Sequence, residues 1–227
     1  MESLNRVQWI YSSRNNQELA ERYDQWAKDY DRDLEQDFEW LGPQRASEIF
    51  AKYVPETSRI LDAGAGTGLV GQLLWEHGYR QIVAMDLSSG MLEEAHKKKV
   101  YQEFHQMVMG GPLDFDTASF DAVVSVGVLT VGHAPASSLD ELARITRPGG
   151  YVVFSLRPDV YETAGFKEKQ AALESEGIWR LIEESEKFKP LPKGEPEVYH
   201  QVWVYQVSLQ PERDAPETYD IVIRSNI

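Results

Sequence analysis

Apolar residues recur at two different spacings along the chain. Residues 16–36 carry apolar side chains at helical spacing, which predicts a helix with an aromatic stripe on one face. The stripe contains Leu19, Tyr23, Trp26, Ala27, Tyr30 and Leu34. Gly42-Pro43 interrupts the pattern, and residues 44–53 predict a second helix. Short, mainly apolar runs at 60–63, 81–85 and 120–126 instead predict buried parallel strands.

The remaining patterns predict more helices and strands. A third strand is expected near residues 104–109, and a helix over 139–145. Arg147-Pro148-Gly149-Gly150 predicts a tight turn into a strand at 151–155. A charged stretch at 163–187 predicts a helix. Residues 198–208 and 219–224 alternate apolar and polar positions, which predicts two antiparallel strands.

A glycine-rich segment follows the first predicted strand. The run Ile60-Leu61-Asp62-Ala63-Gly64-Ala65-Gly66-Thr67-Gly68 leads into a helix pattern at 69–75. Glycine lets the backbone bend sharply and lets a ligand lie against main-chain amides. Asp86 ends the second predicted strand about 20 residues after Gly66, where a carboxylate can accept hydrogen bonds from ribose hydroxyls. The segment therefore predicts a nucleoside cofactor at the tips of these strands.

Two motif frames compete for the same glycines. Gly66-Thr67-Gly68-Leu69-Val70-Gly71 matches the dinucleotide fingerprint, in which the first glycine directly follows the strand. Here Gly64 and Ala65 intervene, and Gly71 falls inside the predicted helix. The alternative frame is Asp62-x-Gly64-x-Gly66-x-Gly68, with an acid two residues before the first glycine. A nicotinamide or flavin site and a plain glycine turn remain weaker alternatives.

The second frame resembles motif I of the class I S-adenosylmethionine-dependent methyltransferases. The later order of strand, helix, proline-glycine turn and strand is similar to the second half of the same fold, so the resemblance covers residues 18–157. It implies an α/β fold with a Rossmann-like, seven-stranded, mostly parallel sheet, helices on both faces and an antiparallel last strand. It also implies S-adenosyl-L-methionine as the cofactor and S-adenosyl-L-homocysteine as its product.

A narrower resemblance involves segments outside the core. Residues 23–31, and residues 166–168 with 177–179, are similar to the Williams–Beuren syndrome chromosome region methyltransferase-like proteins. We expect a single domain over 1–227. Its parts would be an N-terminal helical cap (1–57), a cofactor-binding core (58–157) and a C-terminal helix with an antiparallel strand pair (158–227).

The family resemblance implies a set of cofactor-binding residues: Gly64, Ala65, Gly66, Asp86 and Leu87 around the nucleoside, and Val126 near the amino-acid end of the cofactor. Asp62 either contacts the amino group of the cofactor or organises the glycine loop. Asp86 could instead cap the helix that begins near Ser88. Relatives often carry an acid near the adenine; it is missing here, which leaves the backbone of Gly110 or Gly111 as the candidate contact.

Several other side chains have both functional and structural interpretations. Tyr23 and Tyr30 could stabilise the cationic sulfonium through their aromatic faces, or could belong to the core together with Trp26. His133 lies on a loop expected to face the methyl acceptor, as a general base or as an orienting residue. Arg157 could hold an acidic group of the substrate or form a surface ion pair.

Composition narrows the classes of partner. The 227 residues include 23 basic and 37 acidic side chains, and the net charge of −14 disfavours a nucleic-acid substrate. The absence of cysteine excludes disulfides and cysteine-zinc sites, and the scattered histidines lack metal-ligand spacing. No apolar stretch approaches the roughly 18 residues of a membrane span, and no signal peptide is recognisable, so a cytoplasmic location is expected.

The sequence favours an S-adenosylmethionine-dependent methyltransferase that acts on a small molecule, because no large recognition domain is appended to the core. A protein or peptide methyltransferase remains an alternative, since an acidic surface suits a basic partner. A cofactor-binding regulatory protein without turnover is a third possibility. The oligomeric state is open.

Overall fold

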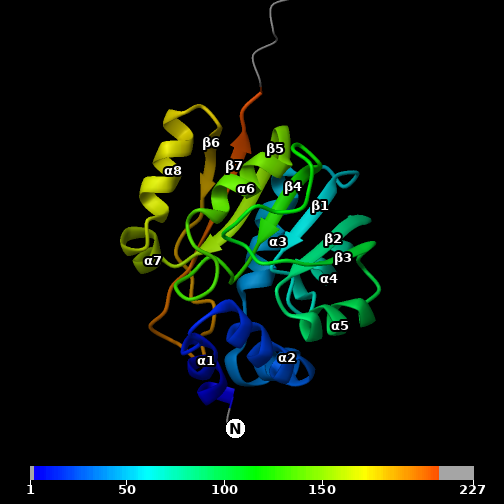
Figure 1. Cartoon of the computed structure of the whole chain (residues 1–227), viewed down its shortest axis with the longest axis vertical. Coiled ribbons are helices and arrows are strands. Elements are labelled where there is room, and N and C mark those ends of the chain that lie inside the picture. The colour runs from blue at the N-terminus through cyan, green and yellow to red at the C-terminus, as the bar shows by residue number, and fades with distance from the viewer. Residues whose placement is uncertain (1–2, 210–227) are drawn as a thin grey trace, which may run out of the picture.

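Seven strands form one sheet in a computed structural model that describes residues 3–209. The spatial order of the strands is β3-β2-β1-β4-β5-β7-β6, and β7 runs antiparallel to both of its neighbours, β5 and β6 (Figure 1). The strands are β1 (Arg59–Ala63), β2 (Gln81–Asp86), β3 (Glu103–Gln106), β4 (Phe120–Ser125), β5 (Thr146–Leu156), β6 (Trp179–Glu184) and β7 (Gln201–Val207). The predicted fold class is confirmed.

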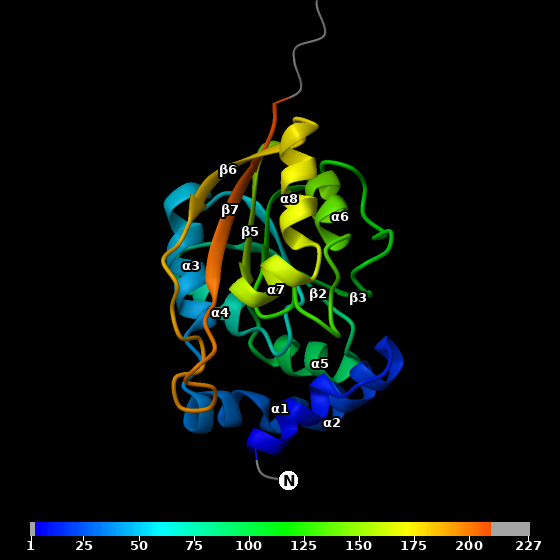
Figure 2. The same ribbon diagram turned by 90° about the vertical axis from the view of Figure 1, so that its left-hand side faces the viewer.

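Helices cover both faces of the sheet (Figure 2). One face packs against α3 (Gly42–Tyr53), α4 (Leu69–Glu76) and α5 (Ser89–Lys97), and the other against α6 (Ser138–Ile145), α7 (Pro158–Thr163) and α8 (Phe166–Ser175). In β1, Ile60 points to the first face, while Leu61 and Ala63 point to the second. All three are fully buried, which explains why apolar residues face both sides of this strand and do not alternate with exposed polar ones.

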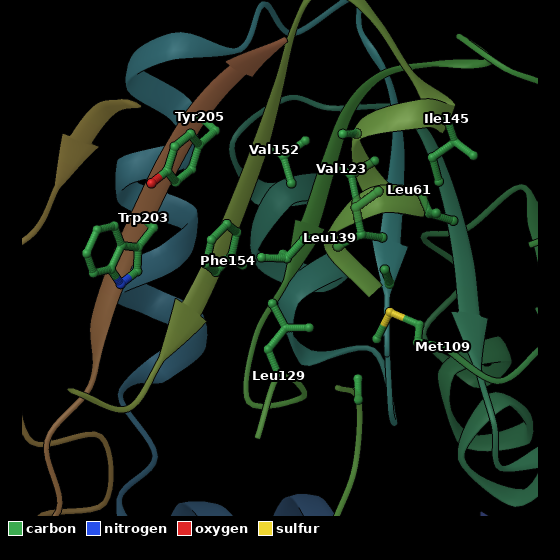
Figure 3. Close-up of a cluster of buried hydrophobic side chains, with 14 of the residues drawn as sticks. Leu61, Met109, Val123, Leu129, Leu139, Ile145, Val152, Phe154, Trp203 and Tyr205 are labelled. Carbon is green, nitrogen blue, oxygen red and sulfur yellow. The ribbon is translucent and has the colours of Figure 1, made fainter. Parts of the chain in front are cut away.

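Aromatic side chains fill the core on the side of α6 and α8 (Figure 3). The rings of Trp179 and Tyr205 stack with their centroids 4.1 Å apart, and Phe154 stacks on Tyr205 at 6.0 Å. The Tyr205 hydroxyl donates to Gln170 Oε1 of α8 at 2.8 Å, so its polar end is paired inside the core. These contacts fix β6 and β7 beside the parallel strands.

The N-terminal helices lie across the carboxyl ends of the parallel strands. We call α1 (Ser3–Tyr11) and α2 (Asn16–Asp33) the cap; a short π-helix, η1 (Leu34–Phe38), follows them. A small apolar cluster of its own holds the cap together: Ile10, Leu19, Trp26, Leu34 and Phe38. The indole of Trp26 donates to Asp33 Oδ2 at 2.9 Å, and Arg6 pairs with the same carboxylate. Trp26 is therefore a core residue of the cap.

The structure corrects the prediction of a helix over residues 163–187. The helical part ends with α8 at Ser175, because Gly177 adopts a positive φ of 70° that terminates it, and 179–184 form the edge strand β6. Charged side chains occur on the solvent-facing side of a surface helix and also on that of an edge strand. The charges of this segment therefore fitted a helix, although part of it forms a strand. On the side away from β5, β7 thus pairs with β6. We predicted a pair with residues 219–224, which lie outside the described residues.

A smaller correction concerns residues 147–150. We predicted a tight turn before the strand, but these residues form an irregular start of β5 itself. Thr146 pairs with Phe120, and the next pair is Tyr151 with Ala122, so the extra residues bulge out of the ladder. Gly149, with a φ of 81°, provides the required left-handed conformation.

Candidate functional site

One cavity lies between the carboxyl ends of β1, β2 and β4 and the cap. It contains about 810 Å³ of empty space, including the part of its mouth that opens to solvent. Its wall is formed by Asn16, Leu19, Tyr23, Tyr30, Trp40, Gly64, Ala65, Gly66, Thr67, Leu69, Val70, Met85, Asp86, Leu87, Met91, Met107, Val108, Met109, Val126, Gly127, Val128, His133 and Ala134.

The glycine loop, residues 64–68, forms one wall. Gly64 has a φ of 82°, and a Cβ there would lie 2.3 Å from Val128 Cγ2, so only glycine fits. Gly66 has a φ of 53°, and no heavy atom lies within 4 Å of the position its Cβ would take. The open side of Gly66 is therefore a surface against which a ligand can lie, as the sequence predicted for this loop.

Asp86 ends β2 and faces the cavity beside the loop. Its carboxylate accepts hydrogen bonds from the Gly66 amide at 2.8 Å and from the Ser88 amide at 2.9 Å. Burial raises the pKa of this carboxyl to about 6. The alternative role considered above, as a cap of α5, falls mainly to the Ser88 hydroxyl, which accepts from the Met91 amide at 3.0 Å.

Asp62 lies behind the glycine loop and does not line the cavity. The Tyr101 hydroxyl donates to its Oδ2 at 2.6 Å, while its Oδ1 is buried with no hydrogen-bond partner in the described chain. Burial raises the pKa of Asp62 to about 7. The loop is held from this side through Tyr101, whose hydroxyl accepts from the Gly71 amide at 3.2 Å. The sequence did not indicate this role of Tyr101.

Tyr101 also decides between the two motif frames. A Cβ on Gly71 would lie 2.2 Å from the Tyr101 ring, so this glycine makes room for a side chain within the core. In the dinucleotide fingerprint the corresponding glycine serves close packing of the helix and the strand. Here it packs against an aromatic ring instead, and the frame that begins at Asp62 describes the loop better.

Aromatic residues close the cavity from the side of the cap. Tyr23 and Tyr30 of α2 both line it, and their ring centroids are 6.4 Å apart. Trp40, which follows η1, stands edge-on to Tyr30 at 6.4 Å and lies over Gly127. Tyr23 and Tyr30 were predicted from the sequence to contact the cofactor. Trp40 was not, because no helical or strand pattern includes it. The π-helix turns the chain so that Trp40 reaches the cavity.

His133 lies on the loop after β4 and contacts the cap. Its Nε2 is 2.8 Å from the Tyr23 hydroxyl, and the Tyr11 ring stands edge-on at 5.4 Å. Its Nδ1 is buried with no hydrogen-bond partner in the part of the chain that the structure describes. Burial lowers the pKa of this imidazole below its ordinary value of 6.5, which favours the neutral form at pH 7.

The structure does not bring all of the predicted residues together. Val126 and Leu87 line the cavity, but Gly110 and Gly111 line a shallower neighbouring hollow with Arg14. The residues that follow β3 into the main cavity are Met107, Val108 and Met109. Arg157 lies outside both and pairs with Asp159 at 2.7 Å, the ion pair considered as its alternative.

Two carboxylates of α2 fasten the cap to the site. Asp24 Oδ1 accepts from the Ser88 hydroxyl at 2.6 Å and from the Gly90 amide at 2.8 Å, at the start of α5. Asp31 accepts from the Thr67 hydroxyl of the glycine loop and pairs with Lys98. The cap is thus tied to the two segments that carry the glycine loop and Asp86.

Comparisons with known proteins identify the family. A family model described as a methyltransferase domain matches residues 61–154. Human Methyltransferase-like protein 27 is 35% identical over 165 residues, which cover 69% of this chain and 66% of that protein. Demethylmenaquinone methyltransferase of Clavibacter sepedonicus is 41% identical over 98 residues, 42% of this chain and 39% of that protein.

Solved structures with the same fold agree. A chain of the complex between the Haloferax volcanii Trm112 methyltransferase activator and a methyltransferase superposes with a TM-score of 0.65 at 18% identity, covering 85% of this chain and 98% of that one. The [4+2]-cyclase SpnF superposes with a TM-score of 0.59 at 13% identity, covering 73% and 81%. At these identities the likeness shows the fold, and SpnF shows that the fold is compatible with other chemistry.

The chain belongs to the class I S-adenosylmethionine-dependent methyltransferases, and this membership implies S-adenosyl-L-methionine as its cofactor. The predicted family and cofactor are confirmed. The aligned region spans 66% of the human relative and 39% of the bacterial one. None of the helices within residues 3–209 is long and apolar enough to cross a membrane.

Proposed function

We propose that the chain transfers a methyl group from S-adenosylmethionine to a small-molecule acceptor inside the cavity beneath the cap. The observation that carries this proposal is the enclosure of the site. Tyr23 and Tyr30 of α2 lie opposite the glycine loop, and Asp24 and Asp31 tie the same helix to the floor. An acceptor must fit into the apolar space that remains. The names of relatives that act on demethylmenaquinone or in ubiquinone biosynthesis support a small acceptor.

The residues around the cavity fit this cofactor. We assign the ribose hydroxyls to the Asp86 carboxylate, the cofactor body to the open side of Gly66 and the adenine to the apolar residues after β3. Asp62, which lies behind the glycine loop and accepts from the Tyr101 hydroxyl, takes the second of its two predicted roles in this assignment and organises the loop. Val126, Gly64, Ala65 and Leu87 complete the wall; Gly110 and Gly111 are not part of this assignment.

When bound, the cofactor supplies a methyl group already activated by its sulfonium. The chain itself therefore has to orient the acceptor, exclude water and remove a proton where the acceptor carries one. Orientation alone accounts for as much as roughly 7–11 kcal/mol of barrier lowering in well-aligned reactions. The faces of Tyr30 and Trp40 stabilise a nearby cation by about 0.5–2 kcal/mol each.

Two experiments test the proposal. Calorimetry should show binding of S-adenosylmethionine and S-adenosylhomocysteine, with NAD giving no heat; NAD binding alone would contradict the assignment of the loop. Incubation with labelled methyl donor and fractionated lysate should then mark a protease-resistant small product. Label found only in protein would favour a protein methyltransferase, and no label despite cofactor binding would favour a regulatory protein. The predicted cytoplasmic location stays a prediction, which imaging of a tagged protein would test.

A further inference from the structure

The Tyr23–His133 pair joins two elements that are 110 residues apart in the sequence. Tyr23 comes from α2 and His133 from the loop after β4, and both line the cavity. Their only polar contact with each other, between the Tyr23 hydroxyl and His133 Nε2, is 2.8 Å long. The cofactor roles proposed above do not need this hydrogen bond, which leaves the pair available to interact with the acceptor.

The charges around the cavity restrict the acceptor. Among the described residues that line it, none is Lys or Arg, and the one acidic side chain is Asp86, which we assign to the ribose. An acceptor that carries a carboxylate or phosphate would find no Lys or Arg in the described lining of this cavity, and its desolvation would be uncompensated. Arg14, which lines the neighbouring hollow, is exposed to solvent and already paired with Glu18. The apolar and aromatic lining from Leu19, Trp40 and Val128 instead suits an uncharged, planar molecule.

We propose that the acceptor is an uncharged phenol-type hydroxyl compound, and that Tyr23 and His133 take its proton during methyl transfer. This inference rests on the proposed function. A neutral amine attacks without prior loss of a proton, and a carboxylate is already ionised, so neither needs a base. A phenol does, because its oxygen is a weak nucleophile until its proton departs. The cavity provides a proton acceptor and no fixed cation, which is the combination that a phenol requires.

The proposed step moves one proton along the pair. This step needs the hydrogen of neutral His133 on Nδ1, where the backbone of Val131 can accept it. The Tyr23 hydroxyl then donates to Nε2, and the oxygen of Tyr23 is free to accept a hydrogen bond from the acceptor. As the acceptor oxygen bonds to the methyl carbon, its proton passes to Tyr23 and the proton of Tyr23 passes to His133 Nε2. The electron pair of the broken carbon–sulfur bond stays on sulfur. The imidazolium later loses its extra proton to water.

The surroundings of the pair favour this sequence of events. Tyr11 of α1 faces the ring of His133, and Tyr30 and Asp86 act electrostatically on Tyr23. Burial raises the pKa of Tyr23 well above its ordinary value, so Tyr23 remains a hydroxyl and passes the proton on. Burial also lowers the pKa of His133, so its neutral form persists in mildly acidic solution. For phenols, the acid limb of the rate profile should therefore lie below about pH 6.5.

The test compares phenols of different acidity as acceptors. The probes are 2-naphthol, a weakly acidic phenol that holds its proton firmly, and 4-nitrophenol, a more acidic phenol whose neutral form loses its proton with little help from a base; 2-naphthylamine and 2-naphthoate serve as matched amine and carboxylate. We expect label transfer to the phenols only. Tyr23→Phe should reduce transfer to 2-naphthol by about 100-fold or more and transfer to 4-nitrophenol by far less. Tyr161→Phe, on α7 outside the cavity, keeps the ring stacked on Trp203; it is the matched control and should leave both rates within about threefold.

A binding measurement provides a readout other than turnover. In the complex with S-adenosylhomocysteine, fluorescence should show 2-naphthol binding about tenfold more weakly to Tyr23→Phe than to the unmodified chain, while 2-methoxynaphthalene binds both equally. Equal loss with 2-naphthol and 4-nitrophenol, preferred methylation of the amine or carboxylate, or cofactor binding without any transfer to the phenols would overturn the inference. Failure of S-adenosylhomocysteine to bind the unmodified chain would instead overturn the proposed function.

Discussion

Asp62 links the chemistry of the site to the stability of the chain. Burial raises its pKa from 3.8 to about 7, and raises that of Asp86 from 3.8 to about 6. A carboxyl with a higher pKa in the folded state than in the unfolded state binds protons more tightly when folded. These two carboxyls should therefore favour the folded ligand-free protein more as the pH falls from about 7 to about 4, which is the reverse of the usual behaviour of paired carboxylates. His200, whose pKa burial lowers to about 4, acts in the opposite direction over this range.

Asp62→Asn should flatten this dependence. A rise of about three pKa units means that ionised Asp62 lowers the free energy of unfolding by up to roughly 4 kcal/mol at high pH. The variant recovers this free energy, less about 1–3 kcal/mol if the N–H groups of the new amide stay unpaired. We expect the variant to be more stable than the unmodified chain at pH 8 and less stable at pH 4. Urea unfolding at the two pH values measures the difference, and parallel pH profiles would contradict the assigned pKa.

Asp86→Asn should weaken cofactor binding while preserving the fold. The amide oxygen can still accept from the Gly66 or Ser88 amide, but the charge that strengthens hydrogen bonds to ribose is lost. The expected loss in the affinity for S-adenosylhomocysteine is about 1–3 kcal/mol by calorimetry. Glu103→Gln, at an exposed position on the edge strand β3, is the control. An unchanged affinity in Asp86→Asn would remove Asp86 from the ribose site.

At the scale of elements, α2 is held to the floor of the site by few hydrogen bonds. Asp24 accepts two of them, so Asp24→Ala should let α2 open more often. We expect faster amide exchange in α2, unchanged exchange in β1 and β4, and a several-fold rise in the KM for the cofactor. Lys28→Ala changes a solvent-exposed position of the same helix and should alter neither. Faster exchange in the sheet as well would mean that the whole domain is destabilised.

The elements also show what the sequence could predict. The strands around the glycine loop were predictable, because buried parallel strands carry apolar residues on both faces. The loop itself was predictable because its glycines serve the local backbone geometry, as at Gly64. The strand at 179–184 was not, because its pattern of charges also fits a helix and its partner is distant in sequence. The contributions of Trp40 and Tyr101 to the site depend on how separate segments pack, so local periodicity did not reveal them.

For the molecule as a whole, cofactor binding should raise thermal stability. A ligand present at about 100 times its Kd stabilises the folded state by about 2.7 kcal/mol. For a chain of 227 residues, each kcal/mol shifts the Tm by about 2–4 °C, so S-adenosylhomocysteine should raise the Tm by roughly 5–10 °C. NAD at the same concentration should leave the Tm unchanged. A shift with NAD equal to that with S-adenosylhomocysteine would show that the cavity does not discriminate between them.

The position of the cap in the chain has a consequence for biosynthesis. Asp24 of α2 binds Ser88, 64 residues later, and Tyr23 binds His133, 110 residues later. A ribosome therefore releases the aromatic stripe of α2 well before it makes the surface on which that stripe is buried. During this interval the nascent helix exposes Tyr23 and Tyr30, which a chaperone can bind, and the cavity closes only after the sheet has formed.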